Sequence, residues 1–167
     1  MGEFLNFIYR DFKYKLYVPS EYNSDKEFPL LVMLHGCKQN ADDFAAGTNM
    51  NTLAEKEKFL VLYPDMNHPL NPLDLTGYNP IGCWNWFLDD NQHRGKGHPK
   101  LIYGMINEVK SNYKIDSNKV YAVGLSAGGA LACILGATYP DAFNSIGICS
   151  GLAYDAANVY LLTDPLA

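Results

Sequence analysis

A serine between two glycines, in the stretch Gly124-Leu-Ser126-Ala-Gly128, has the clearest chemical potential in this chain. It follows a strand-like run, residues 120–123, and precedes a small apolar, helix-like run, residues 130–138. Gly-x-Ser-x-Gly between a strand and a helix is typical of a nucleophile elbow, where glycines relieve the crowding of a sharp turn. The pattern predicts that Ser126 is a nucleophile exposed at the end of a strand.

A second segment could stabilise the charge that such a nucleophile creates. Residues 28–34 form an apolar run, which favours a strand buried on both faces of a parallel sheet, and His35-Gly-Cys37 follows it. In hydrolases with this elbow, one oxyanion-binding amide follows the nucleophile and another follows an earlier strand. We expect these amides at Ala127 and Cys37. We expect His35 to shape its loop by side-chain hydrogen bonds and not to be the base.

A serine nucleophile also needs a histidine base and a carboxylate that orients it, and in this fold both follow the serine. Every histidine of the chain precedes Ser126: His35, His68, His93 and His98. Three aspartates follow it: Asp141, Asp155 and Asp164. Asp141 comes after Tyr-Pro, which indicates a helix stop. The sequence therefore predicts that the base and the acid are missing from these residues and that the chain alone is nearly inactive.

Three motifs stand in order along the chain: His35-Gly-Cys-Lys-Gln39, Cys83-Trp-Asn-Trp-Phe87 and Gly124-Leu-Ser-Ala-Gly-Gly129. Together they resemble the esterase/polyhydroxybutyrate (PHB) depolymerase family, whose relatives include feruloyl and acetylxylan esterases. The resemblance runs from about residue 9 to about residue 154 and implies an α/β-hydrolase domain, a three-layer sandwich with a mostly parallel sheet. It covers roughly the first half of the family's catalytic domain. We expect residues 1–167 to form one domain that is incomplete at its carboxyl end.

The resemblance implies a serine carboxylic-ester hydrolase that works through an acyl-enzyme on Ser126 and uses no cofactor. Its substrate would be a polyester of the polyhydroxyalkanoate kind, or an acyl or feruloyl ester. Two other interpretations stay open. One is a catalytically inactive remnant or binding module of the same fold, and the other is an acyltransferase in which a second alcohol replaces water.

The long connection between residues 64 and 97 is the expected place of substrate recognition. Its aromatic residues Trp84, Trp86 and Phe87 could form an apolar wall for an acyl chain or polymer, with His35 nearby as a further substrate-binding candidate. The same aromatic side chains could equally pack the loop onto the sheet. Residues 91–97 are basic and glycine-rich but lack the spacing of a phosphate-binding loop, and we expect a solvated turn there.

The cysteines show no metal-like spacing, so no metal site is expected. Cys133 and Cys149 stand in apolar segments, which predicts buried thiols. Cys37 and Cys83 belong to the motifs that carry the family resemblance, near the expected active site. We hypothesise that these two form a disulfide under oxidising conditions.

Strands and helices alternate along the chain, which predicts a mostly parallel sheet between two helical layers. We expect an antiparallel first strand at residues 11–18, a strand at 59–63, an amphipathic helix at 101–109 and a further strand at 145–150. Residues 120–167 contain no lysine or arginine. If the last strand lies at the edge of the sheet, it presents an apolar edge that invites self-association.

The remaining partner classes are constrained by charge and hydropathy. The net charge of −5 disfavours nucleic acid. No apolar run is long enough to cross a membrane, so a membrane is not expected as a partner. The first ten residues lack the basic start and apolar core of a signal peptide. The family resemblance suggests an extracellular protein, so the compartment stays open between extracellular and cytoplasmic.

Overall fold

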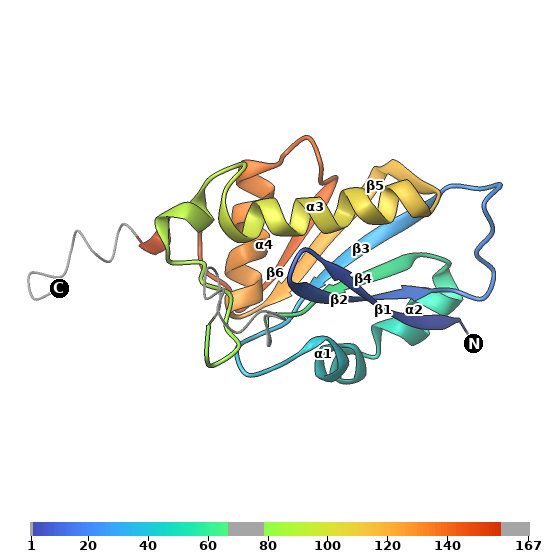
Figure 1. The fold of residues 1–167 in the computed structure, drawn as a ribbon, viewed down its shortest axis with the longest axis horizontal. Coiled ribbons are helices and arrows are strands. Elements are labelled where there is room, and N and C mark those ends of the chain that lie inside the picture. The colour runs from blue at the N-terminus through green and yellow to red at the C-terminus, as the bar shows by residue number, and fades with distance from the viewer. Residues whose placement is uncertain (1, 67–78, 158–167) are drawn as a thin grey trace, which may run out of the picture.

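The structure, a computed structural model, describes residues 2–66 and 79–157 (Figure 1). Within them, six strands form one sheet in the order β1-β2-β4-β3-β5-β6. The strands are β1 (Glu3–Tyr9), β2 (Phe12–Val18), β3 (Phe28–Leu34), β4 (Leu60–Pro64), β5 (Ile115–Leu125) and β6 (Ser145–Cys149). The helices are α1 (Ala41–Thr48), α2 (Met50–Glu57), α3 (Gly97–Asn112) and α4 (Ala127–Thr138), with a short 3-10 helix, η1, at Asp89–Gln92.

The sheet is mostly parallel, which confirms the fold class expected from the sequence. β1 and β2 form an antiparallel hairpin, and β2 is also antiparallel to β4. β4, β3, β5 and β6 run parallel to one another. The carboxyl ends of these four strands therefore lie at one end of the sheet, which is where open α/β sheets place their ligand sites.

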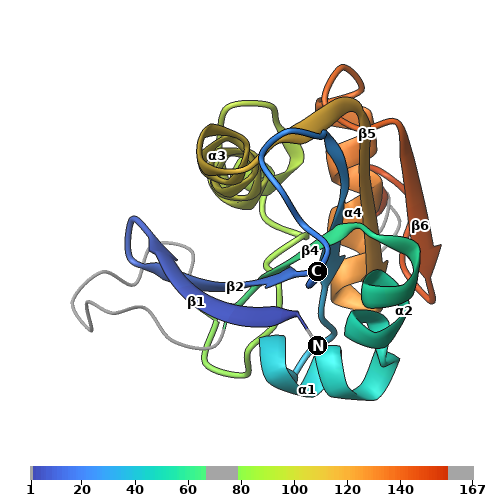
Figure 2. The same cartoon turned by 90° about the vertical axis from the view of Figure 1, so that its right-hand side faces the viewer.

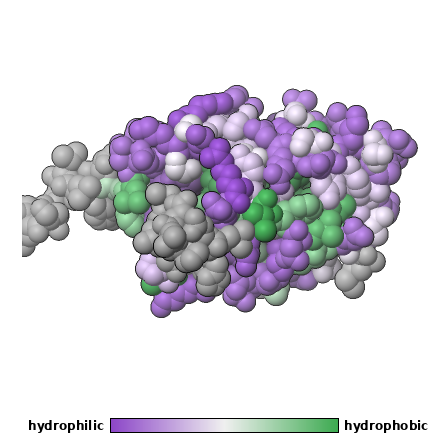
Figure 3. All heavy atoms as spheres, viewed as in Figure 1, coloured by the Kyte–Doolittle hydropathy of each residue, from purple (hydrophilic) through white to green (hydrophobic). Residues whose placement is uncertain are grey.

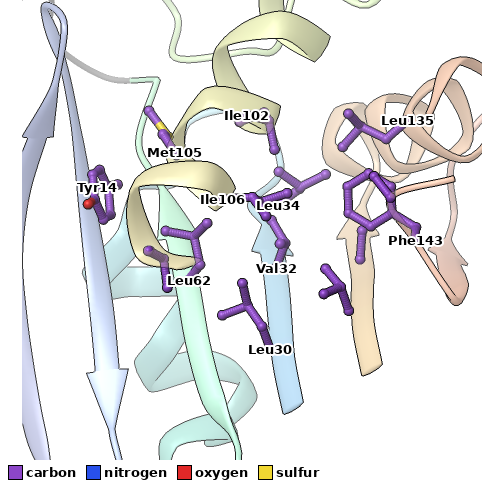
Figure 4. Packing of buried hydrophobic residues seen from close by; sticks show 14 of the residues in the cluster. Tyr14, Leu30, Val32, Leu34, Leu62, Ile102, Met105, Ile106, Leu135 and Phe143 are labelled. Atoms are coloured by element: carbon purple, nitrogen blue, oxygen red, sulfur yellow. The ribbon is translucent and has the colours of Figure 1, made fainter. Parts of the chain in front are cut away.

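Helices cover both faces of the sheet, giving three layers (Figure 2). α3 and α4 share one apolar core with the sheet, and α1 and α2 share a second core on the opposite face. Figure 4 shows Ile102 and Ile106 of α3 over Val32 and Leu34 of β3, and all four side chains are fully buried. Burying each such side chain contributes about 1.5–3 kcal/mol to the stability of the folded state. The amphipathic helix predicted at residues 101–109 is confirmed within α3.

The N-terminal strand β1 is a difference from the sequence prediction, which places the first strand at residues 11–18 and none before it. The apolar residues of β1 do not alternate strictly, because they pack on both faces of the sheet. Leu5 and Phe7 lie against the core that contains α3. Phe4 packs edge-on against Tyr63 on the other face, with ring centroids 5.6 Å apart. A strand that is partly covered on both faces lacks the period-two pattern of a half-buried strand.

The predicted strand at residues 145–150 is confirmed as β6, the outermost strand of the described sheet next to β5. Its side chains Ile146 and Ile148 are 36% and 44% exposed. Self-association through this strand stays a prediction. The prediction that the free thiols are buried is wrong: Cys149 is exposed and Cys133 only half-buried. Cys149 stands on the outermost strand of the described sheet, which pairs with β5 on one side.

The sequence predicts a solvated turn at residues 91–97; residues 93–97 are exposed, as predicted, whereas the two residues before them are buried. Asn91 and Gln92 are each only 3% exposed. The Asn91 amide nitrogen donates to the Asn85 carbonyl at 2.6 Å, and its Oδ1 accepts from the His98 N–H at 2.6 Å. Asn91 thereby ties the loop before it to the first turn of α3. No helix among the described residues is long and apolar enough to cross a membrane.

Candidate active site

Ser126 occupies a sharp turn between β5 and α4. Its backbone has φ 55° and ψ −118°, a conformation that side-chain-bearing residues rarely adopt, and its side chain is exposed. Two hydrogen bonds hold this backbone. The Ser126 N–H donates to the Cys149 carbonyl at 2.8 Å, and the Ser126 carbonyl accepts from the Ala130 N–H at 3.0 Å. Such strain persists only where the surrounding structure imposes it, and it is concentrated at functional sites.

The glycines around Ser126 are required by contacts between backbone segments. A Cβ on Gly124 would lie 2.0 Å from the Gly128 carbonyl oxygen. A Cβ on Gly128 would lie 2.1 Å from the carbonyl oxygen of Leu34, at the end of β3. The first turn of α4 therefore packs directly on the ends of β5 and β3. This is the geometric reason for the spacing of glycines in the sequence motif.

The loop after β3 lies beside Ser126, as expected for an oxyanion-binding loop. A Cβ on Gly36 would lie 3.7 Å from the Ser126 Cβ. The Gly36 N–H donates to the Gln39 Oε1 at 2.9 Å, and the Gln39 N–H donates back to the Gly36 carbonyl at 3.2 Å. We call residues 35–39 the oxyanion loop, after the role that the sequence predicts for the Cys37 amide.

The two amides predicted to bind an oxyanion flank this contact. Ala127 is the first residue of α4, so its N–H has no acceptor within the helix. In the part of the chain that the structure describes, the Cys37 N–H also has no hydrogen-bond acceptor. Both donors therefore remain available to a ligand at Ser126.

A second segment, residues 81–84, fastens the oxyanion loop. Cys37 and Cys83 form a disulfide, which confirms the hypothesis made from the sequence. The Lys38 N–H donates to the Ile81 carbonyl at 3.1 Å. The indole nitrogen of Trp84 donates to the His35 carbonyl at 2.9 Å. One covalent bond and two hydrogen bonds thus fix the backbone on either side of Cys37.

His35 shapes the loop from inside the protein, as expected. Its side chain is 1% exposed. Its Nε2 accepts from the Met66 N–H at 3.2 Å, and its Nδ1 donates to the Gly36 carbonyl at 2.8 Å. This pair of bonds requires the neutral ring with the proton on Nδ1. Burial lowers the pKa of His35, which favours the same neutral form.

The aromatic residues of the long connection differ in whether they pack the loop or present an apolar surface. Trp84 is fully buried between the rings of His35 and His98, at centroid distances of 5.1 and 5.5 Å. Trp84 therefore packs the loop and does not face a ligand. Trp86 is half-buried and contacts Phe87 edge-on. The exposed apolar surface belongs to Phe87, Leu88 and Ile81, at 47%, 47% and 55% exposure.

Leu88 and Ile81 were not predicted as candidates from the sequence, because neither belongs to the aromatic group of residues 84–87. The sequence does contain a weak signal for their exposure, because Ile81 precedes a glycine and Leu88 precedes an aspartate within the long connection. Residues 67–78 of the same connection, which include His68, lie outside the described residues. No group of three or more metal-ligating side chains occurs within residues 2–66 and 79–157.

The acid–base candidates among the described residues are engaged elsewhere. The Asp141 carboxylate forms an ion pair with Arg94 through both oxygens, and this hydrogen bonding lowers the pKa of Asp141 to about 2. The His93 Nε2 lies 3.1 Å from the Asp89 carboxylate on the surface. Asp164 lies outside the described residues. Among the residues that the structure describes, Ser126 and Ala127 thus lie beside the loop that carries Cys37, and no described histidine is hydrogen-bonded to Ser126.

Comparison with known proteins places this geometry in a family. A model of the family described as Esterase PHB depolymerase matches residues 12–163. Poly(3-hydroxyalkanoate) depolymerase C of Paucimonas lemoignei is 36% identical over 129 residues, which are 77% of this chain and 29% of that protein. Feruloyl esterase B of Thermothelomyces thermophilus is 31% identical over 143 residues, 85% of this chain and 45% of that protein.

A solved structure of an acetyl xylan esterase from Aspergillus awamori superposes with a TM-score of 0.78 at 25% identity. The match covers 92% of this chain and 53% of that one. The chain thus spans about half the length of the solved relative and less than half of the two curated ones. These matches confirm the resemblance inferred from the three motifs, and this chain belongs to the Esterase PHB depolymerase family.

Proposed function

We propose that this chain carries the nucleophile and the oxyanion-binding groups of a serine carboxylic-ester hydrolase. The Ser126 hydroxyl attacks the ester carbonyl, the alcohol leaves, and water releases the acyl group from the serine. The observation that carries the proposal is the strained, exposed Ser126 at φ 55° with the oxyanion loop packed beside it. Membership of the family supports ester hydrolysis as the reaction.

The two free amides supply the electrostatic part of the mechanism. As the carbonyl carbon becomes tetrahedral, its oxygen takes up negative charge, and the N–H groups of Ala127 and Cys37 donate to it. Donors that are fixed in advance need no reorganisation when the charge develops. Loss of a single oxyanion donor typically costs about 10²–10³ in turnover. The disulfide and the hydrogen bonds of residues 81–84 provide this fixation for Cys37.

The proton of Ser126 needs a base, and no histidine follows Ser126 in the 167 residues. Among the described histidines, His35 is committed to the oxyanion loop and His98 is packed against Trp84. We therefore infer that the histidine and its carboxylate come from parts of the protein outside the described residues. Removing a triad histidine costs about 10⁶ in turnover, so residues 1–167 alone are expected to be nearly inactive.

The names of the relatives support a choice of substrate class. They include a poly(3-hydroxyalkanoate) depolymerase, a feruloyl esterase and an acetyl xylan esterase. The exposed apolar side chain of Ile81 stands on the segment that fastens the oxyanion loop, and the exposed Phe87 and Leu88 follow shortly after that segment. They suit an apolar acyl or aryl group. The proposed substrates are accordingly polyesters of hydroxyacids and acyl or feruloyl esters.

Covalent labelling with a fluorophosphonate tests the nucleophile directly. Ser126 is expected to react slowly with the probe, and added imidazole is expected to accelerate the reaction by serving as an external base. The phosphonylated residue is identified by intact mass and peptide mapping. Ser126→Ala should abolish labelling, whereas Ser150→Ala, at another exposed turn serine, should leave it unchanged. A folded chain that stays unlabelled at Ser126 even with imidazole would contradict the proposal.

A further inference from the structure

Gln39 makes two hydrogen bonds to Gly36 across the turn that carries Cys37. The Gln39 N–H donates to the Gly36 carbonyl at 3.2 Å, and the Gln39 Oε1 accepts from the Gly36 N–H at 2.9 Å. A Cβ on Gly36 would lie 3.7 Å from the Ser126 Cβ. One residue therefore reaches back to hold the backbone at the point where the oxyanion loop meets the serine.

The backbone N–H groups on both sides of Cys37 are occupied. The Gly36 N–H donates to the Gln39 side chain, and the Lys38 N–H donates to the Ile81 carbonyl at 3.1 Å. The Gln39 N–H closes the turn on Gly36. Among the described residues, no acceptor is found for the Cys37 N–H. The hydrogen bonds of the turn thus leave a single donor, and the Gln39 side chain is what occupies the N–H directly before it.

The direction of the Cys37 N–H is tied to the Gly36 carbonyl, because the two groups belong to one peptide unit. In a trans peptide they point in opposite directions, and the described residues contain no cis bond. The Gly36 carbonyl accepts from the Gln39 N–H and from Nδ1 of His35, whose side chain is buried. The carbonyl therefore points toward the buried ring, and the Cys37 N–H points away from it.

Backbone preference alone does not favour this arrangement. Lys38, the third residue of the turn, has φ 64°, in the left-handed region that residues with a side chain rarely adopt. Gly36 has no Cβ that would restrict its own rotation. The disulfide holds Cys37 through its side chain, so the orientation of the peptide between Gly36 and Cys37 depends on hydrogen bonds. The Gln39 side chain supplies the one that holds the Gly36 N–H.

We propose that Gln39 is a positioning residue for ester hydrolysis at Ser126. Its side-chain oxygen keeps the Gly36 N–H occupied and thereby holds the Cys37 N–H as the donor that the loop presents to the oxyanion. This rests on the proposed function. Gln39 acts through the backbone of Gly36. Without its Oε1 the peptide before Cys37 is free to rotate, and the donor has to be reoriented as the negative charge develops, which costs rate.

Labelling kinetics of Ser126 in the whole chain test this role, with imidazole as the external base. The rate is measured over a range of fluorophosphonate concentrations, which separates the maximal rate of phosphonylation from the concentration that gives half of it. The probe carries an ethyl group, because Figure 3 shows apolar residues at the surface among hydrophilic ones, where a long alkyl chain would bind. Gln39→Met keeps the length of the side chain but removes the acceptor oxygen. Its maximal rate should fall about tenfold or more, with the half-maximal concentration unchanged within about twofold.

Asn40→Ala is the matched control, because it weakens the neighbouring helix and leaves the turn unchanged. The Asn40 Oδ1 accepts from the Asp43 N–H at 2.8 Å and caps the start of α1. Loss of such a cap lowers the unfolding free energy. Urea denaturation should show this loss in Asn40→Ala, while its maximal labelling rate stays that of the unaltered chain. Gln39→Ala, which has no side-chain acceptor, should label as slowly as Gln39→Met, so that the result does not depend on how methionine packs.

Amide NMR gives a second measurement that does not require labelling. In Gln39→Met the Gly36 N–H should exchange with solvent faster and the Cys37 amide resonance should shift or broaden, whereas Asn40→Ala should change neither. Unchanged Gly36 and Cys37 amides, or an unchanged maximal rate in both Gln39 variants, would overturn the proposal. Failure of the proposed function is seen separately, as absence of Ser126 labelling in the unaltered chain. The NMR result then decides by itself whether Gln39 fixes the Cys37 amide.

Discussion

The two ends of the parallel strands are held together by different kinds of interaction. At the carboxyl end, backbone segments touch directly, and Gly128 of α4 leaves no room for a Cβ beside the Leu34 carbonyl. A disulfide and a buried neutral histidine complete this end. At the amino end, one carboxylate, Glu55 of α2, gathers several donors. It accepts from the Tyr17 hydroxyl at 2.6 Å and from the backbone N–H groups of Gly2 and Ser20, each at 3.1 Å.

This difference follows from what each end has to do. The carboxyl end must hold a strained serine and two amides in fixed positions, and close packing without side chains does so regardless of ionic conditions. The amino end only has to keep α2 and the hairpin together, and an ionised carboxylate suffices. The two ends should therefore respond to different perturbations. Added side-chain volume and loss of the disulfide should affect the carboxyl end, whereas strong acid should affect the amino end.

The largest effect is expected from Gly128→Ala. The new Cβ would lie 2.1 Å from the Leu34 oxygen and 2.6 Å from the His35 oxygen, both backbone atoms that cannot move without displacing β3. We expect a loss of about 3–5 kcal/mol in unfolding free energy, or loss of the folded state, measured by urea denaturation. Gly47→Ala, in α1 with no atom within 4 Å of the new Cβ, is the control and should be neutral or slightly stabilising. Similar stability of the two variants would contradict the packing argument.

The next effect is expected from removing the disulfide in the double variant Cys37→Ala/Cys83→Ala. The bond closes a segment of 46 residues, for which restriction of the unfolded chain predicts about 2–4 kcal/mol. Because Cys37 lies beside Ser126, labelling of Ser126 by the fluorophosphonate should also slow. Denaturation and labelling rates are measured together. Cys133→Ala, which removes a free thiol in α4, should leave the labelling rate unchanged.

The carboxyl end was largely predictable from the sequence, and the reason is physical. The motif around Ser126 specifies a turn that only glycines at positions 124 and 128 allow, so the residue types alone indicate the geometry. The loop after β3 was predictable because a doubly buried strand has a continuous apolar sequence. The disulfide was suggested only by the family resemblance, since the spacing of Cys37 and Cys83 carries no local signal.

Other features could not be predicted because they depend on contacts between distant parts of the chain. β1 has no period-two pattern, since its side chains pack on both faces of the sheet. The assignment of Trp84 to packing depends on His35 and His98, which are far from each other in sequence. The exposure of Cys149 depends on what covers β6.

A smaller effect at the carboxyl end concerns the protonation of His35. Burial lowers its pKa below the ordinary 6.5, so below that pH the unfolded chain takes up a proton that the folded chain resists. Stability contributed by neutral His35 is therefore fully present above about pH 6.5 and lost progressively below it. We expect the unfolding free energy to fall by up to about 1.4 kcal/mol per pH unit on acidification from pH 6.5.

Urea denaturation at a series of pH values measures this slope. His35→Gln removes the titrating group and should flatten the dependence between pH 5 and 6.5. His93→Gln, which changes an exposed histidine beside Asp89, should leave it almost unchanged. If the slope is the same in both variants, the buried neutral His35 is not its source.

The smallest effect concerns Glu55 at the amino end. The hydroxyl of Ser20, the hydroxyl of Tyr17 and the Ser20 N–H lower the pKa of Glu55 from 4.5 to about 2. The contribution of the ionised form is fully present above about pH 4.5 and is lost as the pH falls through about 2. Glu55→Gln should therefore raise the midpoint pH of acid unfolding by a few tenths of a unit, followed by circular dichroism.

Glu57→Gln is the matched control, because Glu57 is an exposed acid of the same helix whose neighbour Lys56 is its ion-pair partner. Exchange of the Ser20 amide should accelerate in Glu55→Gln and not in Glu57→Gln, while labelling of Ser126 should stay the same in both. Unchanged labelling is expected because Glu55 acts at the opposite end of the strands from the serine. A fall in Ser126 labelling in Glu55→Gln would show that the two ends are coupled, and the separation drawn between them would then be wrong.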